Sequence, residues 1–110
     1  MSLLKWQRKT LKPLVSELNG EWLKEVGDAL LLRFPSSQDA VRCAIGLQEA
    51  AREVPNLKLR VGIHQGDIIQ EGPDILGDGV NIASRIQQVA PRGGIAISDK
   101  VQQDISGYPE

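Results

Sequence analysis

Two polar side chains four residues apart are the first sign of chemistry in this sequence. Asn81 and Arg85 follow two glycines, Gly77 and Gly79, within the stretch Asp74–Arg85. Glycine tolerates backbone angles that other residues avoid, so a ligand could approach the main chain closely here. Residues four apart share one helix face, so the amide and the guanidinium project together. A bound polyphosphate would use both groups, whereas a solvated amphipathic helix accounts for the same pattern without any ligand.

The element that must position these side chains is a helix that we expect from Val80 onward. Val80, Ala83, Ile86 and Ala90 recur at helical spacing and form an apolar side. Where a glycine-rich loop enters a helix, unpaired backbone N–H groups and the positive end of the helix dipole suit phosphate.

A second stretch with chemical potential, Trp22–Phe34, predicts two strands folded about Gly27. Within it, Lys24 offers hydrogen-bond donors, and Asp28 offers a carboxylate of the kind that hard cations bind. Taken singly, Lys24 is also explained as a strand lysine with its charge in water, and Asp28 is better explained as a polar residue of the hairpin turn. The continuous apolar run Ala29–Leu32 suggests a strand covered on both faces.

In this order, the motifs resemble the catalytic domain of class III nucleotidyl cyclases, the adenylate/guanylate cyclase family. The resemblance runs from about Leu11 to the end of the chain, and five segments together are more specific than any one of them. It implies an α+β fold, with a ferredoxin-like mixed sheet and helices packed on it. Residues 1–110 would then form a single, incomplete catalytic domain, truncated at both ends. The matching segments are Lys24-x-x-Gly27-Asp28, the apolar strand ending in Phe34, Val61–Asp67, Asp74-x-x-Gly77-x-x-Val80-Asn81-x-x-x-Arg85 and Gly93–Ser98.

The resemblance implies conversion of ATP to 3′,5′-cyclic AMP and pyrophosphate, a lyase reaction used in signal transduction. By residue match, Arg85 would stabilise charge on the α-phosphoryl group, and Asn81 would hold the ribose. Lys24 and Asp74 would select the base. Asp28 would bind a metal ion.

The choice of base can also be argued from hydrogen bonding alone. Adenine offers an amino donor beside a ring-nitrogen acceptor; the carboxylate of Asp74 can only accept and the ammonium of Lys24 can only donate. Guanine reverses both edge groups, and unpaired polar contacts in a closed site are costly. We therefore expect ATP to be preferred over GTP. Singly, Asp74 is also explained as a turn residue after Pro73.

The resemblance further implies two Mg²⁺ or Mn²⁺ ions per active site and a homodimer whose two sites lie across the interface. Regulatory domains fused to this segment in a full-length protein would also fit. The family pattern has two metal-binding aspartates, and the first precedes the opening helix, where no acidic residue occurs before Glu17. We therefore expect little turnover from the 110-residue polypeptide.

Two other functions remain open at this point. The chain could be a non-catalytic cyclase-like module that binds a nucleotide or regulates a partner. It could also be a ferredoxin-like interaction domain with no role for nucleotides. Binding of a non-hydrolysable ATP analogue with magnesium distinguishes these readings.

The composition excludes several classes of function. With a net charge of −1 and a pI near 5.8, the chain has no basic patch that would favour nucleic acid. Apolar runs are too short to span a membrane, and the start lacks the core of a secretory signal. A lone cysteine, Cys43, fits a reducing compartment such as the cytoplasm. The single histidine, His64, is better explained as a structural or surface residue than as a metal ligand.

The remaining elements are expected from apolar periodicity and from capping residues. They are a helix over Leu3–Leu18 that Pro13 kinks or starts, a stop at Asn19-Gly20, a helix over Asp39–Glu53 capped by Ser37 with Cys43 in the core, a strand over Leu57–Gln70, a turn over Pro91–Gly94, a strand over Ile95–Ile97, and a last helix from the cap Ser98 to about Ser106.

Overall fold

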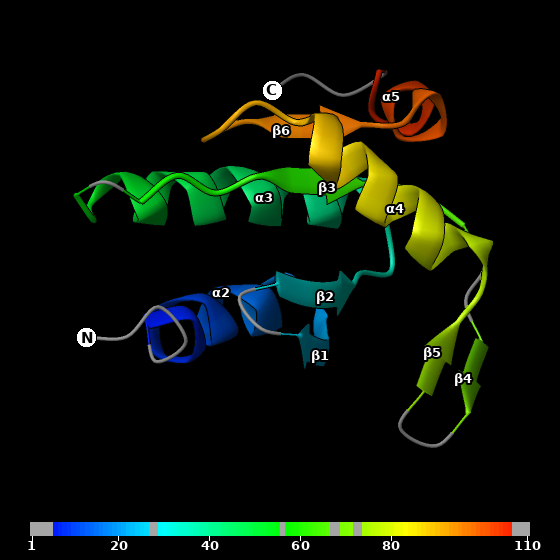
Figure 1. The fold of residues 1–110 in the computed structure, drawn as a ribbon, viewed down its shortest axis with the longest axis horizontal. Helices are drawn as coiled ribbons and strands as arrows, with labels where there is room; N and C mark the ends of the chain where they lie inside the picture. Colours follow the sequence, from blue (N-terminus) through cyan, green and yellow to red (C-terminus); the bar gives the residue numbers. More distant parts are fainter. Residues whose placement is uncertain (1–5, 27–28, 56, 67–68, 72–73, 107–110) are drawn as a thin grey trace.

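The computed structural model describes residues 6–26, 29–55, 57–66, 69–71 and 74–106 (Figure 1). Helices and strands alternate along most of this part of the chain. The elements are η1 (Gln7–Leu11), α2 (Lys12–Glu17), β1 (Glu21–Val26), β2 (Ala29–Arg33), α3 (Ser37–Arg52), β3 (Val61–Ile63), β4 (Ile69–Glu71), β5 (Asp74–Leu76), α4 (Asp78–Val89), β6 (Ile95–Ile97) and α5 (Asp99–Ile105).

The first helical segment divides into two parts close to Pro13, as we expected from that proline. η1 is a π-helical stretch, and α2 begins at Lys12 with Pro13 in its first turn. A first-turn N–H has no intrahelical partner, so proline costs little there. The segment ends as expected, because Asn19 takes a left-handed conformation with φ 64° and the Gly20 N–H donates to the Val15 carbonyl.

The β1–β2 hairpin is antiparallel, as predicted, and its register is irregular between Trp22 and Lys24. The expectation that β2 is covered on both faces is wrong for the described chain. Ala29 is exposed, and the rest of β2 is only partly buried. Leu30 and Leu32, which alternation places on one face, pack against a buried cluster formed by Leu11, Val15, Cys43 and Leu47. The hairpin therefore has one packed face and one less covered face.

Helix α3 joins two hydrophobic clusters and is the centre of the fold. Cys43 and Leu47 pack with η1, α2 and the hairpin, and Ala44 packs with β3, β6 and α5. Figure 1 shows α2 and the hairpin on one side of α3, and β6 and α5 on the other. The cap is Ser36 and not Ser37, since the Ser36 hydroxyl accepts from the N–H of the third residue beyond it. The helix consequently starts two residues before the predicted position.

The predicted strand over Leu57–Gln70 is much shorter than expected. Among its described residues, the strand segments are β3 and the start of β4, and β3 is as short as its partner strand β6. β3 pairs in parallel with β6 over three residues. Before that pairing, the Leu59 carbonyl accepts from the Gly93 N–H and from the buried Gln48 side chain. These contacts replace a longer ladder.

The described strands form three two-stranded sheets, two antiparallel and one parallel. This is the mixed pairing that the sequence predicted. Helix α4 packs on β3 and β6, and the β4–β5 hairpin leads directly into α4 (Figure 1). The last strand and helix lie as expected, with the Ser98 hydroxyl capping α5.

Candidate functional site

The loop-to-helix junction at the candidate site differs from the prediction in two respects. Asp74–Leu76 is a strand, β5, paired with β4, where a loop was expected. Helix α4 starts at Asp78, two residues before Val80, after Gly77 with φ 126°. Backbone with that angle strongly favours glycine, so the chain can turn from strand to helix within one residue. Gly77 has no side chain to cap the helix, and Asp78 places an exposed carboxylate in the first turn.

That carboxylate weakens the expectation that the end of α4 itself suits phosphate. A negative side chain in the first turn already interacts favourably with the positive end of the helix dipole. A phosphate at the same place would meet the repulsion of Asp78. The side chains further along α4 are therefore the stronger candidates for contact with a triphosphate.

Helix α4 lies unusually close to β3, and this contact fixes which face points outward. A Cβ atom built on Gly62 would lie 2.3 Å from the Gln87 backbone nitrogen and 2.8 Å from the Ala83 carbonyl oxygen. Ala83 and Gln87 therefore form the inward face. At about 100° per residue, Asn81 and Arg85 lie roughly 200° around the helix from that face.

Asn81 and Arg85 are both exposed, as this outward orientation requires. Within the described part of the chain, neither side chain takes part in a hydrogen bond or an ion pair. The amide and the guanidinium are thus available to a ligand or to a second protein chain. A guanidinium stays charged and offers a fixed fork of donors, which suits phosphate oxygens.

Lys24 is exposed on β1, a separate element from α4. Its neighbour Glu25 is already engaged: Arg8 Nη2 lies 2.7 Å from Glu25 Oε1, and Trp22 Nε1 donates to Glu25 Oε2. The hydrogen bonds from Arg8 and Trp22 lower the pKa of the Glu25 carboxyl. No hydrogen bond or ion pair is described for the Lys24 ammonium itself.

The two predicted aspartates are less fully described. Asp74 is the first residue of β5, where its backbone pairs with Glu71, and its side chain lies outside the description. Asp28 lies outside the described residues. Among those that are described, no three His, Cys, Asp or Glu side chains cluster as a metal site would require.

His64, for which we expected a structural or surface role, is partly buried and directly follows β3. Its Nδ1 atom is enclosed and has no hydrogen-bond partner among the residues that the structure describes. The ring lies against Gly66, which in turn approaches Gly79 at the start of α4. The closeness of the His64 ring to the start of α4 could not be predicted from the positions of His64 and Gly79 in the sequence.

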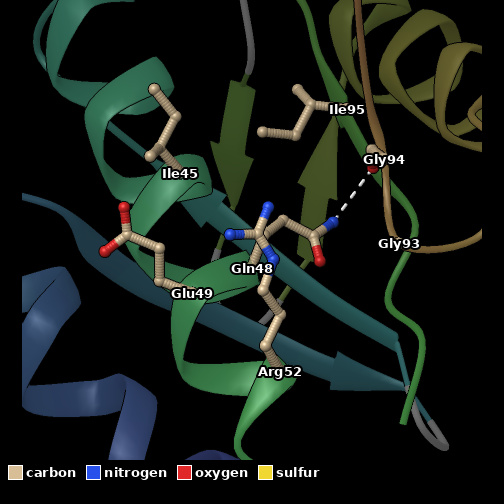
Figure 2. Close-up of a pocket in the computed structure, with 7 residues that line it drawn as sticks. All are labelled: Ile45, Gln48, Glu49, Arg52, Gly93, Gly94 and Ile95. Carbon is tan, nitrogen blue, oxygen red and sulfur yellow. Dashed lines mark hydrogen bonds between the residues drawn. The ribbon is translucent and has the colours of Figure 1, made fainter.

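A hollow in the described part of the chain lies away from these residues, at the opposite ends of β3 and β6. Its volume is about 160 Å³, and Figure 2 shows the Gln48 amide at its centre donating to the Gly94 carbonyl, with Arg52 beside it. An adjoining hollow of about 270 Å³ is lined by Arg52, Lys58 and Arg92. Because Val61 bonds to Gly94 at this end and His64 lies at the other, the hollows are distinct from the start of α4.

A model of the adenylate and guanylate cyclase catalytic domain matches residues 2–108. This chain therefore belongs to the adenylate and guanylate cyclase catalytic domain family, which confirms the resemblance read from its motifs.

Individual relatives agree with that assignment. The "Putative adenylate cyclase 3" of Rhizobium meliloti is 41% identical over 112 residues, which cover 96% of this chain and 19% of that protein. The chain thus spans about a fifth of that relative's length.

Solved structures confirm the fold as a mixed α/β cyclase catalytic core. The crystal structure of an adenylate/guanylate cyclase/hydrolase from Silicibacter pomeroyi is 33% identical, with a TM-score of 0.87, covering 97% of this chain and 68% of that one. The catalytic core of a rhodopsin-guanylyl cyclase with converted specificity, solved with ATPαS, is 25% identical, with a TM-score of 0.84, covering 94% and 66%. In the described part of the present chain, no helix combines the length and apolarity needed to cross a bilayer.

Proposed function

We propose that this chain is an adenylate cyclase catalytic domain, or the larger part of one, that forms 3′,5′-cyclic AMP from ATP across a two-fold interface. The observation that carries the proposal is the outward face of α4. Asn81 and Arg85 are exposed there, and no described residue of their own chain pairs with either. Because neither side chain is buried or engaged in an ion pair among the described residues, both fit a role in binding a nucleotide held between two protomers.

In the proposed reaction, the ribose 3′-hydroxyl releases its proton to solvent, and its oxygen attacks the α-phosphorus and forms the ring. The bond from the α-phosphorus to the bridging oxygen breaks, and pyrophosphate leaves with the electron pair. Arg85 would stabilise the negative charge that builds up on the α-phosphoryl oxygens. Asn81, one helical turn earlier, would orient the ribose so that the attack is in line. Holding both groups on one rigid helix fixes their separation.

Lys24 and Asp74 would select the base. The ammonium of Lys24 donates to a ring nitrogen of adenine, and the carboxylate of Asp74 accepts from its amino group. Engagement of Glu25 by Arg8 and Trp22 supports this role, since the carboxylate next to Lys24 in the sequence already has other partners.

Asp28 is the residue that would bind a divalent ion. A carboxylate is the donor that Mg²⁺ or Mn²⁺ prefers, and Mg²⁺ is commonly held by one or two carboxylates together with substrate phosphates. Such an ion would neutralise phosphate charge and favour deprotonation of the 3′-hydroxyl when bound. The proposed homodimer would bring Asp28 of one protomer to the nucleotide held by Arg85 of the other.

The surrounding protein is also part of the proposal. The chain covers 68% and 66% of the two cyclase structures described above, so we propose that residues 1–110 are one incomplete domain of a longer protein. Regulatory domains fused to it would fit the small share of the Rhizobium meliloti relative that it spans. The buried thiol of Cys43 suits a reducing compartment such as the cytoplasm.

The test is calorimetric titration of the 110-residue chain with a non-hydrolysable ATP analogue and Mg²⁺. Binding is the better readout, because the sequence predicts low turnover for this polypeptide. Arg85→Ala should weaken binding by roughly 10- to 100-fold, as loss of hydrogen bonds from a charged group predicts. Arg92→Ala is the matched control, since Arg92 is also exposed but lies in the turn before β6. Absence of binding by the wild type, or equal losses in both variants, would reject the proposal.

Base selection has a separate test in the same assay. Lys24→Ala should reduce the preference for the ATP analogue over the GTP analogue while leaving the contribution of Arg85 in place. An unchanged preference would show that Lys24 does not contact the base.

A further inference from the structure

His64 is the starting point, because its position is energetically unfavourable for the free protein. Among the described residues, its Nδ1 is a buried side-chain nitrogen that has no hydrogen-bond partner. Buried polar atoms are nearly always paired, and leaving one unpaired destabilises a fold. An apolar side chain would avoid this penalty. The observation therefore requires an explanation, and the proposed contacts with nucleotide do not include this residue.

The histidine ring lies close to the start of α4. A Cβ atom built on Gly66 would lie 3.2 Å from His64 Cδ2 and Nε2, and 3.2 Å from the Gly79 Cα. The edge of the ring is thus at most 6.4 Å from the Gly79 Cα, the two distances placed end to end. Gly79 lies in the first turn of α4, two residues before Asn81. Movement of this turn would move Asn81 with it.

The first turn of α4 has the complementary deficiency. The early N–H groups of a helix have no intrahelical acceptor and are normally satisfied by a capping side chain. Gly77 occupies the cap position and can supply none. The Val80 N–H reaches the Gly77 carbonyl at 3.3 Å, but no acceptor is described for the N–H of Asp78 or Gly79.

The edge of the His64 ring that approaches Gly66 and Gly79 carries Cδ2 and Nε2, and Nδ1 lies opposite that edge. A half-turn of the ring about the Cβ–Cγ bond would put Nδ1 where Cδ2 now lies, next to helix N–H donors for which no acceptor is described. A neutral imidazole whose proton is on Nε2 presents Nδ1 as an acceptor. We infer that His64 is a positioning residue that caps α4 from the neighbouring strand when nucleotide is bound. In the free protein Nδ1 is unpaired. In the bound protein it accepts a hydrogen bond from a first-turn N–H of α4, and so fixes the position of Asn81 and Arg85.

This inference rests on the proposed function, because the bound state is the nucleotide complex. Its physical consequence is specific: a bond that forms only in the bound state contributes to affinity and not to the stability of the free protein. A purely structural histidine would do the reverse.

The test compares His64→Asn with His64→Leu, two side chains of similar size and branching. The asparagine amide oxygen lies at the same number of bonds from Cβ as His Nδ1 and can accept, whereas leucine cannot. Titration with Mg²⁺ and the non-hydrolysable ATP analogue should show binding by His64→Leu about three- to tenfold weaker than by His64→Asn, the value of one hydrogen bond. Without nucleotide, His64→Leu should melt at the same temperature as His64→Asn or higher.

Equal affinities of the two variants, with the wild type still binding, would overturn the inference alone. So would a leucine variant that loses stability and affinity in parallel. Amide hydrogen exchange of the wild type gives a readout that needs no variant: nucleotide should slow exchange at Asp78 or Gly79, and unchanged exchange at both contradicts the cap. Failure of the wild type to bind at all rejects the proposed function and this inference together.

Discussion

The contact between β3 and α4 offers the sharpest test of how the site is positioned. Gly62→Ala adds one methyl group at a point where the three nearest atoms all belong to the backbone of α4. The new carbon would lie 2.3 Å from the Gln87 nitrogen and 2.6 Å from its Cα, with the Ala83 carbonyl at 2.8 Å. Ordinary contacts of this kind are about 3.5–4.0 Å, so α4 must retreat from β3 by roughly 1 Å.

Overpacking of this kind costs about 1–3 kcal/mol, and occasionally more. Because the three nearest atoms all belong to the backbone, no rotamer change can relieve these contacts, and we expect the upper end of this range, about 3 kcal/mol. A domain of this size loses about 4–8 °C of melting temperature per kcal/mol, so the midpoint should fall by roughly 12–24 °C. Gly62→Ala should also weaken nucleotide binding, since α4 carries Asn81 and Arg85.

The assay is thermal unfolding followed by circular dichroism, with urea unfolding to check the free energy. Gly46→Ala is the matched control, because its new Cβ would lie 2.9 Å from Leu14 Cδ2, the far end of a flexible side chain. Alanine also favours the interior of α3 by up to about 1 kcal/mol, so this variant should stay within about 1 kcal/mol of the wild type. A Gly62→Ala protein that melts within 2 °C or so of the wild type would refute the reasoning.

Three further predictions concern the core and one ion pair. The nearly isosteric change Gln48→Glu should destabilise the fold by about 3 kcal/mol at pH 7, because it places a carboxylate against two carbonyl oxygens that now accept hydrogen bonds from the Gln48 amide. A urea unfolding midpoint close to that of the wild type would contradict this prediction. Burial raises the pKa of the Cys43 thiol to about 11, so roughly one thiol in a thousand is ionised at pH 8. Iodoacetamide should therefore label the native protein far more slowly than the urea-unfolded protein. Equal labelling rates would show that the thiolate is accessible in the native protein. Arg8 lowers the pKa of Glu25 below its ordinary 4.5, so the stability that this pair provides is present above about pH 4.5 and is lost as pH falls through the folded-state pKa. Glu25→Gln should therefore lower the melting temperature by more at pH 7 than at pH 3. A difference in melting temperature that does not change with pH would exclude the pairing.

Local patterns in the sequence were sufficient for the helices and for the hairpin. The periodicity of α3 predicted that Cys43 would be buried, and it is 1% exposed. The stop at Asn19 and the cap Ser98 follow from residue preferences that need no tertiary contact. The cap of α3 was misplaced by one residue because Ser36 and Ser37 are both able to cap, and only the geometry distinguishes them.

Features that depend on distant partners could not be predicted in the same way. Alternation suggested a long strand ending at Gln70, but the Gly93 N–H and the Gln48 side chain bind the Leu59 carbonyl and leave β3 only three residues. The buried Nδ1 of His64, which has no hydrogen-bond partner among the described residues, could not be predicted from alternation along its strand. At the candidate site, the spacing of Asn81 and Arg85 predicted a shared face; that this face points outward also required the contact of Gly62 with α4.

The central claim is that one nucleotide is held by residues of two protomers, and a mixing experiment tests it most directly. Asp28→Asn and Arg85→Ala each impair both sites of their own homodimer. When the two variants are mixed in equal amounts, half the dimers are mixed, and each mixed dimer has one site with both residues intact. We predict that magnesium-dependent binding of the ATP analogue, weak in either variant alone, recovers to roughly one quarter of the wild-type sites in the mixture. A mixture that binds no better than the two variants measured separately would contradict the account.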